Sequence, residues 1–319
     1  MHPAPQAPQL VTLTVNPALD ITTDVDTVRP TDKMRCGPAR YDPGGGGINV
    51  ARVAHALGTR ACAVFPAGGV TGGLLTELLD RAQVRFRRVP IAEPTRESFT
   101  VNESRSGQQF RFVLPGPVLS GDEQAACLRA VDEAARTAPY VVASGSLPPG
   151  VDADFYQVVG DVCAHTGARF VLDTSGRGLT HITSGVFLLK ASVRELRDCS
   201  GGDLTTDVEQ VAAARALIDG GRAEIVVVSR GGDGALLVTG HSSHHFPAVP
   251  VAAGSGVGAG DAMVAGIVVG LTRGWDLGKA VRLGIAAGAA MLLTPGTATC
   301  TRADVERIFD TAPEPTVIR

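Results

Sequence analysis

The sequence of 319 residues has little net charge, no long apolar run and no export signal. A net charge of −3 argues against a protein that coats nucleic acid and against a polybasic membrane binder. The longest apolar runs, around 262–272 and 283–293, are too short to span a membrane. Residues 1–9 lack the basic and apolar regions of a signal peptide, so we expect a disordered tail there and a soluble, cytoplasmic protein.

Several common kinds of site are missing as well. Six cysteines are scattered along the chain with no CxxC pair and no histidines at zinc spacing, which favours reduced thiols that fill core space. The stretch nearest to a Walker P-loop, 274–280, has the wrong spacing and lacks Ser or Thr. The glycine run that begins at Gly44 is not a dinucleotide-binding motif, because its sixth position is Asn49 rather than Gly or Ala.

Glycine is the residue type in excess. The chain has 39 glycines, whereas average usage is roughly 7%. Fifteen of them fall in four short stretches, at 44–47, 68–73, 231–234 and 254–260. Apolar or helix-forming segments flank each stretch, which favours ordered loops whose backbone approaches another group closely.

Strand and helix patterns alternate along most of the chain. We expect strands at six near-continuous hydrophobic runs: Leu10–Val15, Ala61–Phe65, Tyr140–Ser144, Arg169–Asp173, Val186–Lys190 and Glu224–Ser229. Helical patterns lie between them at Ile48–Leu57, Leu74–Ala82, Gln124–Arg136, Phe155–His165 and Thr205–Asp219, and buried helices are expected in 259–293. This alternation predicts an α/β fold with a doubly wound, mostly parallel sheet flanked by helices.

Two segments, 20–43 and 86–114, break this alternation. They alternate polar and apolar residues and contain no helical pattern, which is typical of antiparallel strands with one wet face. We expect these two insertions to form a small sheet that acts as a lid over the glycine loops. The sequence therefore predicts one globular unit over 10–319 that carries this lid.

The strongest local signal is the stretch 254–261, which ends in Gly-Ala-Gly-Asp and leads into an apolar helix. A glycine-rich turn at a helix start presents backbone N–H groups at the positive end of the helix dipole, and these bind anions. Gly258, Ala259 and Gly260 are placed to hold a transferring phosphoryl group, and Asp261 to accept the proton of an attacking hydroxyl. The alternative, that Asp261 only caps the helix, stays open at this point.

The run of four glycines at 44–47 also precedes a helix. Such a run lets the backbone touch a ligand, and Asn49 is placed to bond a sugar hydroxyl. A purely structural turn is the alternative, although it needs one or two glycines rather than four. The predicted lid adds basic side chains that together could hold a substrate phosphate: Lys33, Arg35, Arg96 and Arg111.

The tetraglycine-Ile-Asn run near residue 45 and the Gly-Ala-Gly-Asp run near residue 260 together resemble the ribokinase-like (PfkB) family of carbohydrate kinases. The resemblance covers about residues 10 to 310, and its finer points are similar to the phosphosugar branch that includes the minor bacterial 6-phosphofructokinase. The segments that carry it are 12–20, 33–36, 43–52, 65–69, 111–116 and 144–150. It implies a ribokinase-like fold with a small β-sheet lid.

The resemblance also implies roles for individual residues. The sugar hydroxyls would be contacted by Asp20, Gly44, Gly45 and Asn49, and the sugar phosphate by Lys33 and Arg96, with Arg35 or Ser146 assisting. The catalytic base would be Asp261, with the anion hole at Gly258, Ala259 and Gly260. The ATP site would include Ser229, Gly231 and Gly234, with Lys190 and Glu195 near the phosphates and Mg²⁺, and in some members a K⁺ ion lies near the positions of Val251, Ser255 and Val257.

Two positions depart from the family pattern. Ser192 stands where the family has an asparagine that helps to organise magnesium-bound water, and Gly256 stands where threonine is common in the nucleotide region. Both departures put turnover and metal handling in doubt, while the fold and the sugar site are unaffected.

The function that the resemblance implies is ATP-dependent phosphorylation of fructose 6-phosphate to fructose 1,6-bisphosphate. Fructose 1-phosphate and tagatose 6-phosphate stay open as alternative substrates. Ser192 and Gly256 also leave open a catalytically weak regulatory protein that binds a sugar phosphate or a nucleotide. Because edge strands are pairing surfaces, we expect a homodimer through the lid strands.

Overall fold

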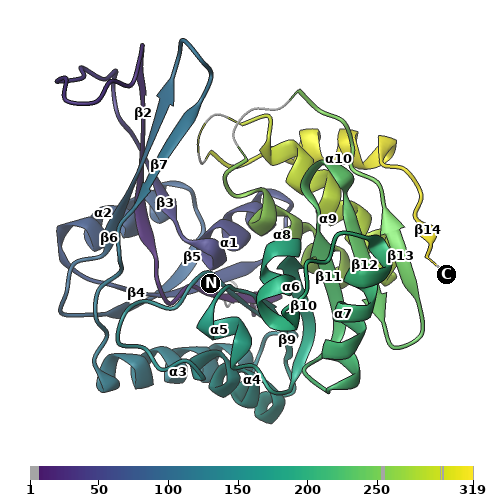
Figure 1. The fold of residues 1–319 in the computed structure, drawn as a ribbon. Helices are drawn as coiled ribbons and strands as arrows, with labels where there is room; N and C mark the ends of the chain where they lie inside the picture. The colour runs from purple at the N-terminus through teal and green to yellow at the C-terminus, as the bar shows by residue number, and fades with distance from the viewer. Residues whose placement is uncertain (1–6, 253–255, 295, 297, 319) are drawn as a thin grey trace, which may run out of the picture.

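A mostly parallel β-sheet forms the centre of the molecule in the computed structural model, which describes residues 7–252, 256–294, 296 and 298–318 (Figure 1). Within these residues the sheet has ten strands in the order β14-β13-β12-β11-β10-β9-β8-β1-β4-β5. The strands are β1 (Leu10–Leu13), β4 (Ala61–Ala67), β5 (Arg85–Pro90), β8 (Tyr140–Ser144), β9 (Arg169–Asp173), β10 (Val186–Ser192), β11 (Ala223–Ser229), β12 (Ala235–Thr239), β13 (Ser243–Phe246) and β14 (Thr316–Val317). Strands β5 to β11 in this order are parallel, and β12, β13 and β14 add an antiparallel edge.

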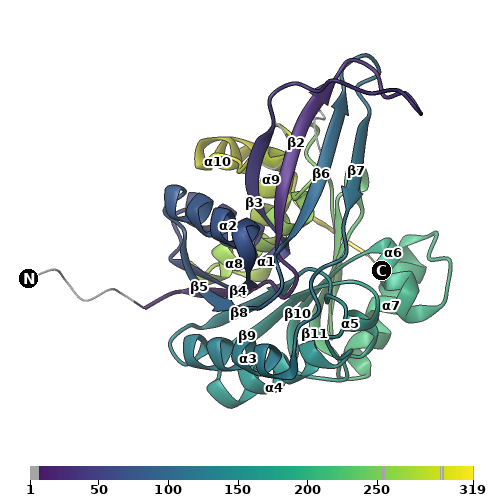
Figure 2. The same ribbon diagram turned by 90° about the vertical axis from the view of Figure 1, so that its left-hand side faces the viewer.

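Helices cover both faces of this sheet (Figures 1 and 2). One layer consists of α1 (Gly46–Ala56), α2 (Gly69–Arg81), α8 (Ala259–Thr272), α9 (Leu277–Met291) and α10 (Arg302–Thr311). The other layer consists of α3 (Gly121–Ala135), α4 (Phe155–Thr166), α5 (Arg177–Thr180), α6 (Val193–Ser200) and α7 (Asp207–Asp219). Among the described residues, no helix is both long and apolar enough to cross a membrane.

Two apolar cores lie on the two faces of the sheet, and this explains the continuous hydrophobic runs. Successive side chains of a strand point to opposite faces, so Leu10 of β1 packs into one core and Val11 into the other. The predicted doubly wound α/β architecture is confirmed, and the predicted strands at 140–144 and 169–173 have the observed bounds. Helix α2 begins at Gly69, five residues before the predicted start.

The early start of α2 accounts for the glycine stretch at 68–73. A Cβ added at Gly68 would lie 2.3 Å from the carbonyl oxygen of Glu93, and one at Gly72 would lie 2.9 Å from Oγ1 of Thr95. The first turn of α2 therefore packs directly against the segment of chain around Glu93 and Thr95. Gly68 and Gly72 therefore serve backbone packing, whereas an added Cβ at Gly73 would meet no atom within 4 Å.

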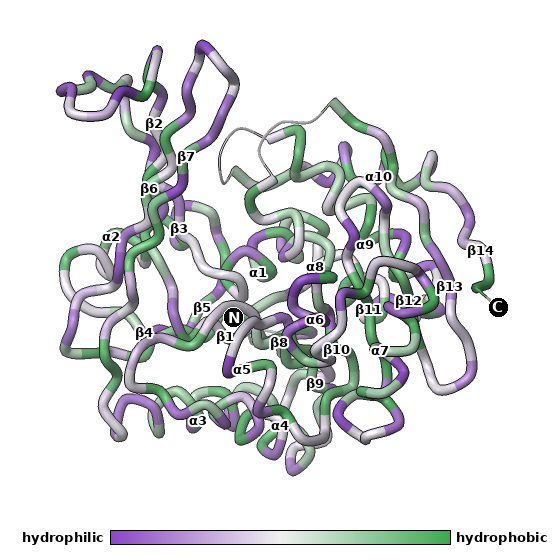
Figure 3. The backbone as a smooth tube through the Cα atoms, viewed as in Figure 1, coloured by the Kyte–Doolittle hydropathy of each residue, from purple (hydrophilic) through white to green (hydrophobic). Residues whose placement is uncertain are grey.

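A smaller sheet projects from one side of the molecule (Figures 1 and 2). It has the order β3-β2-β6-β7, with β2 (Ala18–Val25), β3 (Arg40–Gly44), β6 (Arg96–Glu103) and β7 (Gln109–Val113). We call it the small sheet. Hydrophilic and hydrophobic residues mix along its strands (Figure 3), as the alternating sequence predicts.

The small sheet differs from the prediction in two ways. The pairs β2–β3 and β6–β7 are antiparallel as expected, but β2 and β6 pair in parallel. In addition, residues 86–90 do not belong to it, because β5 pairs in parallel with β4 at the edge of the main sheet and Phe86 packs against the main core. The second insertion therefore contributes its strands from Arg96 onward.

The topology determines where a site forms. The chain runs from β1 to β4 and β5 on one side, and later returns to β8, β9, β10 and β11 on the other. A ligand crevice is expected where the strand order reverses, outside the carboxyl ends of β1 and β8. The loops that follow Leu13 and Ser144 open at that edge.

The close packing of α8 against α9 gives a prediction about stability. A Cβ on Gly266 of α8 would lie 2.6 Å from the carbonyl oxygen of Leu283 in α9, so Gly266→Ala should lower the unfolding free energy by about 1–3 kcal/mol. The matched control is Gly73→Ala in α2, where an added Cβ meets no atom within 4 Å and should stabilise by about 0.5–1 kcal/mol. Chemical denaturation checks both changes, and equal effects would contradict the packing argument.

Candidate active site

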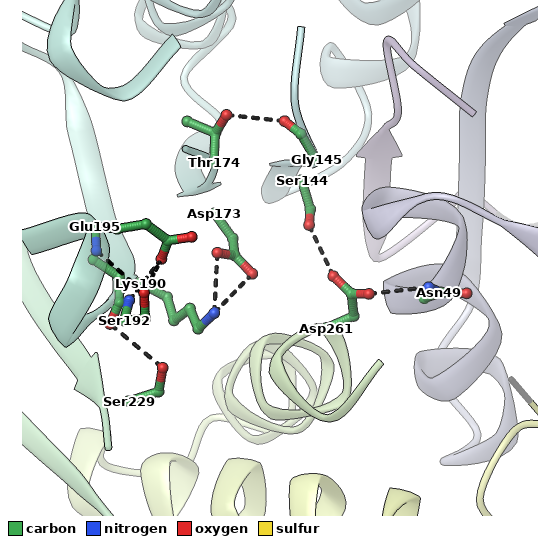
Figure 4. Close-up of polar contacts among 11 residues, drawn as sticks. Asn49, Ser144, Gly145, Asp173, Thr174, Lys190, Ser192, Glu195, Ser229 and Asp261 are labelled. Carbon is green, nitrogen blue, oxygen red and sulfur yellow. Dashed lines mark hydrogen bonds and ion pairs between the residues drawn. The ribbon is translucent and has the colours of Figure 1, made fainter. Parts of the chain in front are cut away.

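Asp261 lies in the first turn of α8, at the crevice edge of the sheet (Figure 4). Its carboxylate accepts a hydrogen bond from Nδ2 of Asn49 at 3.0 Å and another from Oγ of Ser144 at 3.1 Å. Asn49 comes from α1, and Ser144 ends β8. The helix begins after Gly258, whose φ of 76° is a left-handed conformation that favours glycine. Three segments far apart in the sequence thus hold one carboxylate at a helix N-terminus.

The pKa of Asp261 is raised to about 6. Burial is the largest cause, and the negative charge of Asp173 adds to it. The hydrogen bonds from Asn49 and Ser144 and the charge of Lys190 act in the opposite direction. A carboxyl group with this pKa is ionised at neutral pH and is a stronger base than an exposed aspartate, which suits it to accept a proton.

The four glycines at 44–47 bring α1 close enough for this arrangement. A Cβ on Gly46 would lie 2.2 Å from Oγ of Ser144, and one on Gly47 would lie 2.5 Å from the carbonyl oxygen of Leu13. A Cβ on Gly44 would lie 2.2 Å from Oδ2 of Asp20. Two of the glycines therefore seat α1 against β1 and β8, and a third leaves room for the carboxylate of Asp20.

Lys190 of β10 lines the same edge of the sheet as Asp261. Its Nζ is 3.1 Å from Oδ1 and 3.2 Å from Oδ2 of Asp173, and both side chains are almost fully buried (Figure 4). Burial alone would lower the pKa of Lys190, but the charges of Asp173 and Glu195 outweigh it and raise that pKa. A Cβ on Gly260 would lie 2.9 Å from this Nζ, so the start of α8 contacts the ammonium group closely.

Two cavities meet at the start of α8. A polar cavity of about 220 Å³ is lined by Ser144, Gly145, Ser146, Asp173, Thr174, Ser175, Lys190, Glu195, Gly258, Gly260 and Asp261. A largely apolar cavity of about 570 Å³ is lined by Ser229, Gly231, Gly232, Gly234, Ala248, Val249, Pro250, Val251, Gly256, Ala259, Gly260, Met263, Ile285, Gly288, Ala289 and Leu292. Gly260 lines both cavities. One cavity suits phosphates and the other a flat apolar group such as a base.

Most residues expected at the nucleotide line these two cavities, but some do not. Ser192 is the N-cap of α6, where its Oγ accepts from the backbone N–H of Glu195 at 3.2 Å and donates to Oε2 of Glu195 at 2.8 Å. Ser192 itself does not line the polar cavity, but it holds the side chain of Glu195, which does. Val257 is buried outside both linings, and Ser255 lies outside the described residues.

Two of the residues expected at the sugar, Gly44 and Arg96, lie near the carboxylate of Asp20 on β2. Burial raises the pKa of Asp20 to about 6, while Arg111, Arg96 and Arg52 lower it by their positive charges. Three arginines thus act on one carboxylate at the junction of the small sheet with the main body. This side of the crevice is suited to an anionic ligand with hydroxyl groups.

Lys33 and Arg35 do not join this cluster within the described chain. Both are exposed in the segment 26–39 that connects β2 to β3. Arg96 lies near Asp20, but its guanidinium donates to the carbonyl oxygens of Asn16, Leu114 and Pro17, at 3.0, 3.0 and 3.4 Å. These three bonds hold the Arg96 guanidinium against backbone carbonyl oxygens.

Three residues of this site were not predicted from the sequence: Ser144, Asp173 and Arg52. Ser144 and Asp173 are the last residues of β8 and β9, and polar residues that end buried parallel strands lie at the crevice edge. That signal was present in the sequence. Arg52 follows Asn49 by three positions, and an arginine on an otherwise apolar helix face was a second signal.

Known proteins with similar sequences cover nearly the whole chain. The profile described as pfkB family carbohydrate kinase matches residues 14–304. A Mycobacterium tuberculosis protein named ATP-dependent 6-phosphofructokinase isozyme 2 is 66% identical over 311 residues, which cover 98% of this chain and 92% of that protein. A Bacillus subtilis 1-phosphofructokinase is 31% identical and covers 88% of this chain and 91% of its own length.

A solved structure shows the same fold. Phosphofructokinase-2 from Escherichia coli in complex with fructose-6-phosphate matches with a TM-score of 0.90 and 36% identity, covering 96% of this chain and 99% of that one. Other solved structures of the E. coli protein are described as a complex with potassium and as a tetrameric inhibited form. The expected ribokinase-like fold with its additional small sheet is confirmed.

The raised pKa of Asp261 gives a prediction about stability against pH. Between about pH 4 and pH 6 the folded state binds a proton that the unfolded state has lost, so the wild-type unfolding free energy should fall as pH rises. Asp261→Asn removes this loss, and its stability relative to wild type should increase by about 2–3 kcal/mol from pH 4 to pH 7. Denaturation at both pH values measures the difference.

The control for this prediction is a carboxyl group that titrates outside the same pH range. The hydrogen bonds from Thr301 and Arg307 lower the pKa of Asp304, so its contribution to stability is lost only below about pH 4, and the stability of Asp304→Asn relative to wild type should stay nearly constant from pH 4 to pH 7. The assignment of a raised pKa to Asp261 fails if Asp261→Asn changes no more than Asp304→Asn over this range.

Proposed function

Since the chain belongs to the pfkB family of carbohydrate kinases, we propose that it transfers the γ-phosphoryl group of ATP to the 1-hydroxyl of fructose 6-phosphate. The product is fructose 1,6-bisphosphate. The observation that carries the proposal is the position of Asp261, which lies where the phosphate cavity meets the sugar side of the crevice. The 66% identity to a protein named as a 6-phosphofructokinase supports the choice of substrate.

In the proposed reaction Asp261 is the general base. It takes the proton of the 1-hydroxyl as the oxygen bonds to the γ-phosphorus and the bond from phosphorus to the β-γ bridging oxygen breaks. The first turn of α8, from Gly258 through Gly260, presents backbone N–H groups and the positive end of the helix dipole to the transferring group. Lys190 faces the same cavity and balances the negative charge of the phosphates.

ATP and Mg²⁺ fit this pair of cavities. The adenine would occupy the apolar cavity beside Gly231 and Gly234, and the phosphates the polar one. Asp173 and Glu195 place carboxylates in the polar cavity, yet the described residues hold no cluster of three or more acidic, histidine or cysteine ligands. This donor set suits an ion held mainly by phosphate and water, with Glu195 acting indirectly. Bound Mg²⁺ would neutralise charge on the phosphates.

A monovalent-cation site near the anion hole is a further part of the proposal. The E. coli structure in complex with potassium supports it. Val251 lines the apolar cavity, and Val257 directly precedes Gly258, the N-cap of α8. Backbone carbonyl oxygens of this region would be the K⁺ ligands, since neither valine has a polar side chain.

The sugar phosphate would lie between the small sheet and the main body. Asp20 and Asn49 would bond its hydroxyls, and Arg111 with Arg96 would hold its 6-phosphate. The small sheet would act as a lid that excludes water once both substrates are bound. Lys33 and Arg35, in the exposed segment 26–39, would join the site only after that segment has moved or from a second copy of the chain.

The homodimer through the small sheet is also a proposal. Its edge strands β3 and β7 carry large exposed hydrophobic residues, namely Tyr41, Phe112 and Val113, with exposures of 44%, 54% and 58%. An exposed apolar edge strand pairs readily with a second copy. The structure of the E. coli relative described as tetrameric is consistent with dimers that associate further.

A 1-phosphofructokinase is the rival function, because a B. subtilis protein of that name is 31% identical. The cations around Asp20 fit a phosphate on either sugar. A panel of fructose 6-phosphate, fructose 1-phosphate and tagatose 6-phosphate discriminates them by kcat/KM. A protein that binds these ligands in thermal-shift assays without turnover would instead favour a regulatory binder, as Ser192 and Gly256 suggested.

The catalytic role of Asp261 gives a prediction about turnover. With ATP, Mg²⁺ and fructose 6-phosphate, Asp261→Asn should lower kcat by at least about 10²-fold, because a general base typically contributes 10²–10⁴. Wild-type activity should also fall below about pH 6 as Asp261 becomes protonated. Asp304→Asn on α10 is the control and should keep full activity. A loss below about tenfold, with folding verified, would rule out the proposed base.

The proposed dimer gives a prediction about assembly. Phe112→Asp on the edge strand β7 should convert the protein from dimer to monomer in sedimentation velocity, because it places a charge in the proposed interface. Val208→Asp on α7 replaces an equally exposed hydrophobic residue far from the small sheet and should leave the mass unchanged. An unchanged dimer in the Phe112 variant would place the interface elsewhere.

A further inference from the structure

Arg52 is a buried cation that the proposed mechanism does not use. It lies on α1 and is only 8% exposed. Burial of a guanidinium is costly unless the group is paired and hydrogen-bonded. Burial lowers the pKa of Arg52, while the charges of Asp42 and Asp20 act against this change. A residue retained in such a place needs partners that explain it.

The partners of Arg52 belong to two different parts of the molecule. Its Nη1 donates to the carbonyl oxygen of Pro43 at 3.1 Å, and its Nη2 lies 3.6 Å from Oδ1 of Asp42, both in β3 of the small sheet. The same Nη1 also approaches Oδ1 of Asn49 at 3.5 Å, one helical turn earlier on α1. Asp42 is fixed in turn by Nε of Arg40 at 2.8 Å.

Asn49 lies between Arg52 and the proposed base, Asp261, and contacts both. Its amide has one acceptor atom and one donor group, and the donor faces Oδ2 of Asp261 at 3.0 Å. If the amide were turned over, its oxygen would face the carboxylate and its N–H groups would face the guanidinium. Both contacts would then be repulsive. Arg52 and Asp261 together therefore select one orientation of the Asn49 side chain.

We propose that Arg52 is a positioning residue for phosphoryl transfer, linking β3 of the small sheet to the amide of Asn49 and thereby orienting Asp261. This inference rests on the proposed kinase function, in which Asp261 takes a proton. Arg52 itself contacts neither the polar nor the apolar cavity. Its effect on the reaction passes through Asn49.

Arginine suits this position better than lysine. A guanidinium offers several N–H donors in a rigid fork, so it reaches Pro43, Asp42 and Asn49 together. A lysine ammonium is a single point on a flexible stem and would favour the charge of Asp42. Arg52→Lys should therefore keep most of the wild-type stability, while its kcat should be several-fold below that of wild type.

A double-mutant cycle tests the proposal. The variants are Arg52→Met, Asn49→Ala and the combination of both, assayed for kcat and for the KM of each substrate. We expect Arg52→Met to lower kcat about tenfold and to leave the KM for ATP nearly unchanged. In the Asn49→Ala background the same change should matter less than about twofold, because the relay is already absent.

A matched control separates positioning from general stability. Arg273 is the C-cap of α8 and is exposed, but it donates to the carbonyl oxygen of Leu57 at 2.8 Å, a bond similar to that of Arg52 with Pro43. Arg273→Met should lower the melting temperature without changing kcat. Multiplicative effects of the Arg52 and Asn49 substitutions on kcat, or equal effects of the Arg52 and Arg273 substitutions, would overturn the proposal.

Two further measurements apply if the Arg52→Met variant does not fold or if the wild type shows no activity. If Arg52→Met does not fold, the cycle is carried out with Arg52→Lys, for which non-additivity is again required. If the wild type shows no turnover with any phosphosugar, the proposed function fails, and the same cycle is measured from unfolding free energies of the free protein. Coupling between positions 49 and 52 would then still support the contact, and additivity would overturn it.

Discussion

The partial burial of one carboxylate, that of Asp261 at the start of α8, is the constraint on which the site depends. A carboxylate withdrawn from water needs hydrogen bonds, and its two partners, Asn49 and Ser144, come from α1 and β8. The reversal of strand order beside β1 brings the ends of these elements to one edge of the sheet. Withdrawal from water raises the pKa of Asp261, and the raised pKa suits the group to the base role proposed for it.

Glycine makes these approaches possible, but for more than one reason. The excess of glycine correctly indicated where backbone comes close to another group. It did not indicate which group, because Gly46 and Gly47 meet protein atoms of Ser144 and Leu13, and Gly68 meets a carbonyl oxygen. The stretch that begins α8 and the loop around Gly231 and Gly234 line cavities, yet Gly234 also meets protein, since its added Cβ would lie 1.9 Å from the carbonyl oxygen of Phe246. Sequence alone does not separate packing against protein from clearance for a ligand.

The doubly wound architecture could be predicted because the strands at its centre are almost continuously apolar and the longer helices between them have a recognisable pattern, whereas the helices α5, α6 and α10 were not predicted. The small sheet was harder. Alternation predicts a half-exposed strand but not its partner, so the parallel pairing of β2 with β6 and the place of β5 at the main-sheet edge could not be derived. The same limit applies to long side chains, since the three carbonyl partners of Arg96 depend on how distant loops meet.

The two buried cations of the site, Lys190 and Arg52, show how one chain uses two kinds of positive charge. Each of them lies near carboxylates. Lys190 pairs with Asp173, and Arg52 interacts with Asp42 and Asp20. An ammonium group on a flexible stem, at the wall of the polar cavity, is able to turn from Asp173 toward an incoming phosphate. A guanidinium bound to fixed acceptors cannot turn in this way. In the proposed reaction, the residue that meets a changing ligand is therefore the lysine, and the residue that holds a fixed geometry is the arginine.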